Sequence, residues 1–204
     1  MIPSRKRKTQ DPCQVCFLHK DRCICDTLPN LTLKTKITLI IHAKELKRTT
    51  NTGRLAAKAL TNSEIRIRGV MNEALDLTDL LVPEYRTFLF YPSDNALELD
   101  HDLVSSSPLP IQLIVPDGNW RQASKVHYRH HELDAVPRVK ISTPNLADLH
   151  MRAETTEAGM ATLEAIASAL GIIEGERVKD ELMGFYQRKL EETLRGRGQL
   201  SVKG

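Results

Sequence analysis

Several common signatures are missing from this chain of 204 residues. The longest apolar run, around residues 37–41, is far shorter than the roughly 20 residues that a membrane-spanning helix needs. The basic residues 5–8 are not followed by an apolar stretch, so we expect no secretory signal and a cytoplasmic protein without membrane contact. Neither a P-loop nor a G-x-G-x-x-G motif after a strand is present, which excludes these two glycine-rich nucleotide-binding sites.

Cysteine is scarce and is confined to one short segment. The four cysteines lie within 13 residues, as Cys13-x2-Cys16-x6-Cys23-x-Cys25. Clustered thiols in a cytosolic protein favour a metal site over disulfides. Four thiolates suit a tetrahedral zinc ion, which small all-cysteine knuckles need in order to fold. The Cys-x-Cys half is tighter than the usual zinc spacing, so a redox pair or an iron–sulfur cluster remains an alternative.

Acidic residues are scarce in the first third of the chain. Residues 1–70 carry 15 Lys and Arg but only 5 Asp and Glu, whereas residues 71–204 carry 14 and 21. This asymmetry indicates one side that faces a polyanion, for which nucleic acid is the best candidate. The cations interleaved with predicted strands and a helix support this interpretation better than the basic tail; they are Lys34, Lys36, Lys44, Lys47, Arg48, Arg54, Arg66 and Arg68.

The hydrophobic pattern predicts an α/β protein. Apolar residues make up 41% of the chain and charged residues 27%, as in globular domains, and the length fits one domain with an appendage. Runs rich in β-branched residues predict strands at 31–43, 65–70, 87–91, 111–115 and 139–142. Helical patterns cover 55–60, the segment after 119, about 156–170 and about 178–194, and 93–110 reads as a loop.

The stretch around Asp117 combines a strand end with a helix start. The β-branched run before Pro116 predicts a buried strand, and Asn119 is a good N-cap for the helix that follows. Asp117 and Trp120, the only Trp, then lie at the carboxyl end of a strand, where ligands bind in open α/β sheets. The alternative is a turn whose Asp hydrogen-bonds its own backbone while the Trp packs in the core.

Two further polar segments are candidates for binding. Asn51, Thr52, Gly53 and Arg54 precede a helical run, so they could cradle an anion or a small molecule, or they could simply cap the helix. Arg152 could clamp a carboxylate or phosphate through two hydrogen bonds. Its alternative is an ion pair with one of the nearby glutamates, Glu154, Glu157 or Glu164.

These segments together carry a family resemblance. Asp117-Gly118-Asn119-Trp120 resembles the Asp-x-Thr-Trp motif of the DTW-domain family, with Asn119 where that family usually has Thr. Both residues can cap a helix and donate a hydrogen bond. Asn51-Thr52-Gly53-Arg54 is similar to the family's Asn-Thr-x-Arg loop, and Arg152 with Thr162 and Glu164 is similar to its Arg…Ser/Thr-x-Glu-Ala segment. The cysteine cluster resembles the family's N-terminal knuckle.

The resemblance implies a tRNA-uridine aminocarboxypropyltransferase. Such enzymes move the 3-amino-3-carboxypropyl group of S-adenosylmethionine to N3 of a uridine and release methylthioadenosine. The implied fold is a SPOUT-like, knotted α/β catalytic domain over residues 31–204, with a basic tail and a structural zinc knuckle over residues 1–30. Although knots are rare in proteins, the resemblance predicts one here. It also implies tRNA as partner, and we expect a monomer without an obligate protein partner.

The resemblance also implies roles for individual residues. Asp117 would take the N3 proton, for which it would need a dry pocket, or would orient the uridine. Trp120 would stack on adenine or uridine, or pack in the core. The residues that would bind the cofactor are Asn51, Thr52, Gly53, Arg54, Pro116, Gly118, Asn119, Arg152, Thr162 and Glu164.

Two other functions remain open at this stage. The same pocket could serve methyl transfer, as in most SPOUT enzymes. The chain could also be a zinc-containing RNA-binding module without catalysis. For such a module, polar residues at Asp117, Asn51 and Arg152 would be superfluous.

Overall fold

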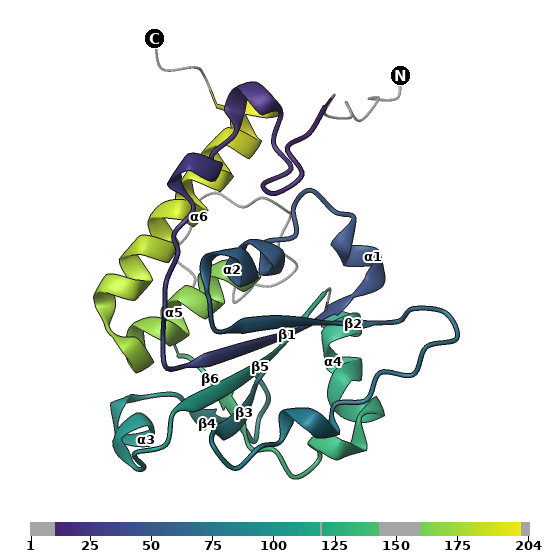
Figure 1. Cartoon of the computed structure of the whole chain (residues 1–204), viewed down its shortest axis with the longest axis vertical. Helices are drawn as coiled ribbons and strands as arrows, with labels where there is room; N and C mark the ends of the chain where they lie inside the picture. Colours follow the sequence, from purple (N-terminus) through teal and green to yellow (C-terminus); the bar gives the residue numbers. More distant parts are fainter. Residues whose placement is uncertain (1–10, 119, 143–159, 201–204) are drawn as a thin grey trace.

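A fully parallel β-sheet forms the centre of the molecule (Figure 1). The computed structural model describes residues 11–118, 120–142 and 160–200, without the side chains of Trp120, Arg121 and His127. Within these residues the sheet has six strands in the order β2-β1-β5-β3-β6-β4. They are β1 (Lys36–His42), β2 (Ser63–Arg68), β3 (Arg86–Phe90), β4 (Leu97–Glu98), β5 (Ile111–Asp117) and β6 (Arg138–Lys140).

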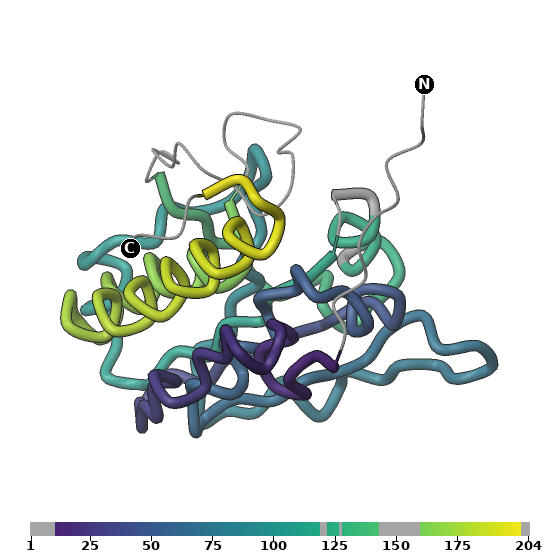
Figure 2. The backbone as a smooth tube through the Cα atoms, turned by 90° about the horizontal axis from the view of Figure 1, so that it is seen from above, coloured from purple at the N-terminus to yellow at the C-terminus, as the bar shows by residue number. Residues whose placement is uncertain are grey.

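Helices cover both faces of the sheet, which is the usual arrangement for parallel strands. The α-helices are α1 (Ala43–Leu46), α2 (Gly53–Ala59), α3 (His101–Ser105), α4 (Trp120–Arg129), α5 (Thr162–Glu174) and α6 (Glu176–Gly196). Short 3₁₀ helices are η1 (Lys20–Arg22), η2 (Cys25–Thr27), η3 (Thr78–Leu80) and η4 (His131–Leu133). Seen from above, α5 and α6 lie on one side, and the loop after β2 extends from the other (Figure 2).

Alternating residues of the central strands build two separate cores. In β1, Leu39 and Ile41 pack with α2, α5 and α6, whereas Ile40 packs with α4 and the 3₁₀ helices η3 and η4. In β5, Val115 joins the first core and Ile114 the second. This division follows from the period of two in a strand, and burial on both faces explains why these strands are apolar throughout.

The predicted α/β class is confirmed, and each of the five predicted strands is found with shifted ends. The strand predicted at 31–43 begins only at Lys36, and Leu31 instead forms an isolated bridge with Leu60. Met160, which the sequence placed in the long helix, precedes α5. The final helix is slightly longer than predicted.

The prediction of a plain loop over residues 93–110 is wrong, because this segment contains β4 and α3. The strand β4 adds two residues at the edge of the sheet, beside β6. The Asp100 side chain caps α3 by accepting a hydrogen bond of 2.8 Å from the backbone N–H of Leu103. Both elements are too short to produce a hydrophobic period. The Asp100 N-cap was a sequence signal for α3 alone.

The structure also places Pro116 inside β5 rather than after it. A proline in a central strand is unusual because it cannot donate a ladder hydrogen bond. Here β3 pairs with β5 only as far as Ile114, so Pro116 has a paired neighbour on the β1 side alone. As a result, β5 runs on to Asp117, and Asp117 is a strand residue rather than a turn residue.

Two other expectations concern the chain as a whole. The SPOUT-like knot depends on the path between β6 and α5, where residues 143–159 lie outside the described residues, so the knot stays a prediction. None of the helices in the described part of the chain is both long and apolar enough to cross a membrane.

Candidate active site and metal centre

Asp117 lies at the centre of a buried polar cluster. The amide Nδ2 of Asn51 donates a hydrogen bond of 2.5 Å to Asp117 Oδ2. The hydroxyl of Thr162 donates one of 2.6 Å to Asp117 Oδ1. The carboxylate is only 7% exposed. Three residues that the sequence named separately therefore meet where β5 ends, α2 begins and α5 begins.

The loop before α2 is built around close approach to this carboxylate. A Cβ at Gly53 would lie 2.5 Å from Asp117 Oδ2 and 2.8 Å from Leu39 Cδ2, so only glycine fits there. The Asn51 side-chain oxygen accepts a hydrogen bond of 3.1 Å from the Arg54 N–H in the first turn of α2, whereas the side chain of the N-cap residue Thr52 makes no capping bond. Thr52 Oγ1 accepts one of 3.2 Å from the Leu163 N–H and ties the loop to α5.

The hydrogen bonds constrain the chemistry open to Asp117. Donors to both oxygens stabilise the ionised carboxylate and fix its orientation. A general base has to give up part of this stabilisation when it takes a proton. The geometry therefore makes Asp117 a carboxylate with a fixed orientation.

Arg54 lies beside this cluster and has two buried donor atoms without an acceptor among the described residues. Its Nη1 donates a hydrogen bond of 2.8 Å to the Leu46 carbonyl, and its guanidinium lies 3.6 Å from the centroid of the Phe17 ring. Burial lowers the pKa of Arg54, and the charge of Asp117 partly opposes this. Among the described residues, nothing accepts from its buried Nε and Nη2 atoms. A buried guanidinium edge without acceptors suits an anionic ligand such as a carboxylate.

The other predicted cofactor residues are distributed around the same end of the sheet. Glu164 is buried, and its Oε2 accepts a hydrogen bond of 3.2 Å from the Ala161 N–H ahead of α5. A Cβ at Gly118 would lie 2.9 Å from Gln122, so this position also needs glycine. Arg152 and Asn119 lie outside the described residues, as does the side chain of Trp120.

The four cysteine sulfurs form one compact group. All lie within 4.8 Å of one another, with 3.6 Å between Cys13 and Cys25 and 3.8 Å between Cys16 and Cys23. A disulfide requires about 2.05 Å, and none is formed. A metal–sulfur bond of about 2.3 Å in a tetrahedron gives sulfur separations of about 3.8 Å. The cluster therefore has the dimensions of a site for a single tetrahedral metal ion.

The knuckle is held against α6 and the first core. Phe17, with φ of 57°, turns the chain tightly, and its N–H donates to the Cys13 carbonyl at 2.9 Å. Lys189 of α6 is buried and donates a hydrogen bond of 2.6 Å to the Cys16 carbonyl. Burial lowers the pKa of Lys189 to about 8. Through Cys16 the knuckle contacts α6, and through Phe17 it contacts Arg54.

Sequence reasoning missed both of these contacts. Phe17 directly follows Cys16 of the knuckle. An aromatic residue next to a cysteine of the knuckle was the only sequence signal for its contact with Arg54. Lys189 falls in the apolar stripe of α6, at helical spacing from the buried residues Phe185, Tyr186 and Leu182. A lysine at such a position indicates a buried partner, because a lone charge in a core is costly.

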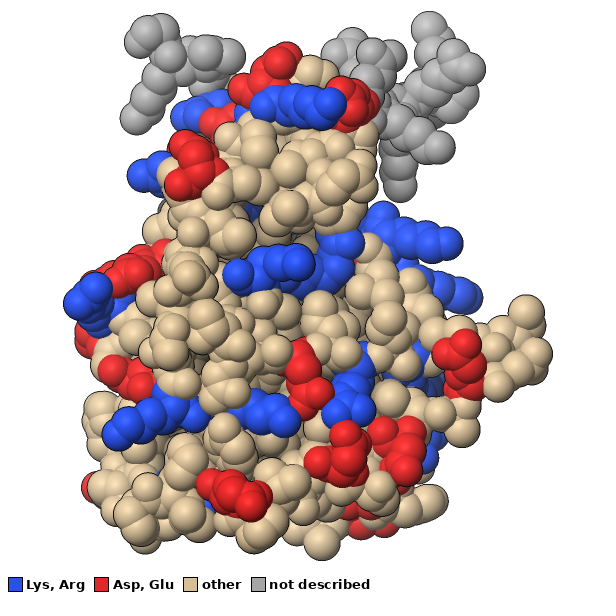
Figure 3. All heavy atoms as spheres, in the orientation of Figure 1, with Lys and Arg blue, Asp and Glu red and all other residues tan. Residues whose placement is uncertain are grey.

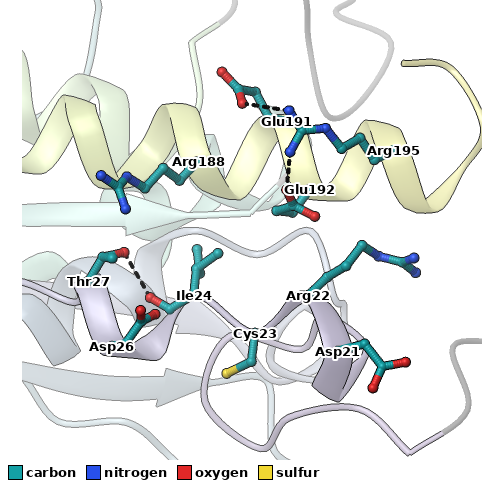
Figure 4. Close-up of a pocket in the computed structure, with 10 residues that line it drawn as sticks. All are labelled: Asp21, Arg22, Cys23, Ile24, Asp26, Thr27, Arg188, Glu191, Glu192 and Arg195. Carbon is teal, nitrogen blue, oxygen red and sulfur yellow. Dashed lines mark hydrogen bonds and ion pairs between the residues drawn. The ribbon is translucent and has the colours of Figure 1, made fainter. Parts of the chain in front are cut away.

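A groove of about 430 Å³ lies between residues 21–27 of the knuckle and residues 188–195 of α6 (Figure 4). Arg195 lies on its α6 side and pairs with Glu191 and Glu192. The exposed ligand Cys23 lies on the opposite side. The full lining is Asp21, Arg22, Cys23, Ile24, Asp26, Thr27, Arg188, Glu191, Glu192 and Arg195. Acids outnumber arginines in this groove, so it does not favour a polyanion.

The fold and the site define a parallel α/β protein with a four-cysteine cluster that could hold a metal ion and an Asp–Asn–Thr hydrogen-bonded cluster at the carboxyl edge of its sheet. A family model described as DTW domain matches residues 10–194, so the chain belongs to the DTW-domain family. The family prediction is thereby confirmed.

Curated relatives are similar over most of this chain. A tRNA-uridine aminocarboxypropyltransferase 2 of Macaca fascicularis is 25% identical over 178 residues, which cover 85% of this chain and 60% of the relative. Its counterpart in Drosophila melanogaster is 28% identical over 180 residues, covering 84% and 68%. A tRNA-uridine aminocarboxypropyltransferase A of Arabidopsis thaliana is 26% identical over 227 residues, covering 94% and 86%. This chain thus spans about 60% of the macaque relative's length. No solved structure matches the chain.

Proposed function

We propose that this protein transfers the 3-amino-3-carboxypropyl group of S-adenosylmethionine to N3 of a uridine in tRNA, with release of methylthioadenosine. The names of the relatives support the transfer and the substrate class. The observation that carries the proposal is the hydrogen-bonded cluster of Asp117, Asn51 and Thr162, which unites residues from three family motifs. We propose that the protein works as a monomer without an obligate protein partner.

The residues of the cluster fit the donor molecule. S-Adenosylmethionine supplies an activated carbon next to its sulfonium, together with a neutral leaving group. The free Nε and Nη2 atoms of Arg54 would hold the carboxylate of the transferred group. We propose that Gly53, Pro116, Gly118, Thr162 and Glu164 contribute to the donor site; Asn119 and Arg152, outside the described residues, stay candidates for binding the donor.

For Asp117 we propose an orienting role. Its two oxygens already accept hydrogen bonds from Asn51 and Thr162, so the carboxylate is held in place as an acceptor for a uridine N–H. It would hold the uracil ring in position. N3 would lose its proton to water, the resulting N3 anion would form the new N–C bond, and the C–S bond of the donor would break to release methylthioadenosine. Trp120 stays a candidate for stacking on a base.

For the cysteine centre we propose a structural zinc ion. The sulfur separations support it, and the sulfonium of the donor needs no metal to leave. The zinc would hold the knuckle, and thereby Phe17, against Arg54.

The test is to incubate the protein with S-adenosylmethionine and unmodified tRNA and to weigh the nucleosides after digestion. We expect a uridine that has gained the aminocarboxypropyl group, with label from the methionine side chain and none from the methyl carbon. A methyl-sized gain would support a methyltransferase instead. Binding of tRNA without any gain would support a non-catalytic RNA-binding module.

Asp117→Ala should abolish transfer, because the uridine loses its acceptor, while tRNA binding changes little. Asp134→Ala removes an exposed carboxylate and serves as the control with unchanged activity. Since burial makes Asp117→Ala a folding risk, Asp117→Asn keeps the shape, and thermal unfolding of both variants checks the fold. Full activity in a folded Asp117→Ala variant would contradict the proposed role.

A further inference from the structure

Cations gather at the carboxyl edge of the sheet, on the face that α4 covers. We call the group of Lys44, Arg68, Lys125 and Arg129 the basic edge. It is assembled from α1, β2 and α4, which come from distant parts of the chain. Figure 3 shows Lys and Arg side chains protruding over α1, at the upper right of the molecule.

Strand register places the basic edge beside the candidate active site. His42, the last residue of β1, is paired with Arg68, the last residue of β2. On the other side of β1, Ile41 is paired with Asp117. Two strand spacings of about 4.8 Å put the backbones of Arg68 and Asp117 about 10 Å apart. Because side chains alternate, Asp117 faces α2 and α5 while His42 and Arg68 face α4, so the two groups lie on either side of one edge.

Helix α4 completes the group. Arg68 Nη1 donates a hydrogen bond of 3.1 Å to the Gln122 carbonyl, which ties β2 to the first turn of α4. Lys125 and Arg129 are four residues apart and so share one face of this helix. Tyr128, also on α4, is 71% exposed. The nearby charges of Arg68, Lys44 and Lys125 add to burial in lowering the pKa of His42.

Among the described residues, the four cations of the basic edge are not paired with acids. Within the described ranges, Lys44, Arg68, Lys125 and Arg129 form no ion pair, and the neighbouring Glu45 is buried and paired with Arg48 at 3.0 Å. Two cations that the sequence proposed for nucleic-acid binding, Lys36 and Arg66, lie on β1 and β2. Both pair with Glu64, which reduces their net charge. Like charges held together without acids repel one another, and a bound polyanion removes this cost.

We infer that the basic edge binds the phosphate backbone of the RNA substrate and delivers a nucleotide across the edge of the sheet to Asp117. This inference rests on the proposed function for the choice of RNA. The cations supply backbone contacts that carry no sequence information, and the exposed ring of Tyr128 offers a surface for stacking on a base. Two of the four cations come from the acidic part of the chain, so composition alone concealed them.

The test measures binding of unmodified tRNA to the full chain, without S-adenosylmethionine, over a series of salt concentrations. We compare the wild type with the double variant Lys125→Ala/Arg129→Ala. The matched control is Arg177→Ala/Arg188→Ala, which removes the same charge from α6. We expect the first variant to bind at least about tenfold more weakly and to lower the salt slope by about one to two, whereas the control behaves as wild type.

Equal loss of affinity in both double variants, or no loss in either, would overturn the inference. Because Arg129, Arg177 and Arg188 are exposed and Lys125 is only half-buried, unchanged thermal unfolding should accompany these measurements. The proposed function is scored separately, by transfer in the wild type. If Lys125→Ala/Arg129→Ala binds tRNA more weakly but the wild type transfers nothing, the binding role of the basic edge stands and the proposed transferase function fails. If the wild type shows transfer but the variant binds tRNA normally, the proposed function stands and the binding role fails.

Discussion

At the scale of single residues, the site depends on close packing around one carboxylate. Asp117 meets Asn51 and Thr162, which lie 66 and 45 positions away in the chain. A buried carboxylate that loses a hydrogen-bond partner costs about 1–3 kcal/mol or more. The residue types could be chosen from the sequence, but their mutual distances depend on how three elements pack.

Gly53→Ala tests this packing directly. The added methyl group would lie 2.5 Å from Asp117 Oδ2, so either the carboxylate or α2 must move. We expect the free energy of unfolding to fall by about 1–3 kcal/mol and transfer activity to drop more than tenfold. Denaturant unfolding and initial rates measure the two effects.

Gly184→Ala is the matched control for this substitution. Gly184 lies within α6, and a Cβ there would meet nothing within 4 Å. Alanine should therefore stabilise the helix by about 0.5–1 kcal/mol and leave activity unchanged. Equal effects of the two substitutions would contradict the packing argument.

At the scale of elements, the cysteine knuckle supports the active-site loop through a single aromatic ring. The Phe17 ring stacks on the Arg54 guanidinium. Lys189 of α6 donates a hydrogen bond to the Cys16 carbonyl of the knuckle. The proposed zinc, although it would take no part in the chemistry, would thus influence donor binding. Its influence would pass through the orientation of Arg54.

Phe17→Leu should separate this influence from metal binding. Leucine stays apolar but removes the cation–π contact, which is worth about 0.5–2 kcal/mol. We expect KM for S-adenosylmethionine to rise by roughly threefold to thirtyfold, with kcat and metal content nearly unchanged. Phe17→Tyr keeps the ring and should behave as wild type. Loss of metal in Phe17→Leu would instead show that the ring serves the knuckle alone.

At the scale of the whole molecule, the knuckle belongs to the main core rather than to a separate unit. Cys16, Leu18 and Ile24 are buried in the same cluster as residues of α2, α5 and α6. Loss of the metal should therefore weaken the entire fold.

Removal of the proposed zinc by a chelator should lower the free energy of unfolding by about 3 kcal/mol or more, the linkage expected when free metal exceeds its dissociation constant about a hundredfold. Denaturant unfolding before and after chelation, and after zinc is added back, measures this change. Cys23→Ser alters the exposed ligand and so disturbs packing least. This variant should resemble the chelated protein and should not respond to the chelator. Elemental analysis that found no zinc in the wild type would contradict the assignment.

The sequence by itself predicted the five longer strands, the longer helices and the residue types that carry the chemistry, but not the short β4 and α3. Apolar runs of β-branched residues predicted the central strands, because burial on both faces demands such runs. The spacing of the four cysteines predicted a metal site, since its ligands are neighbours in the chain. The local pattern also indicated Asp117, at the end of a strand, as a candidate site residue.

The tertiary structure alone decided which distant residues meet. The register of three parallel strands places Arg68 and Asp117 at one edge, and no local pattern encodes that register. The contacts of Phe17 with Arg54 and of Lys189 with Cys16 likewise depend on how helices dock. Local sequence sets backbone and side-chain preferences within an element, whereas contacts between elements arise from burying their apolar faces together.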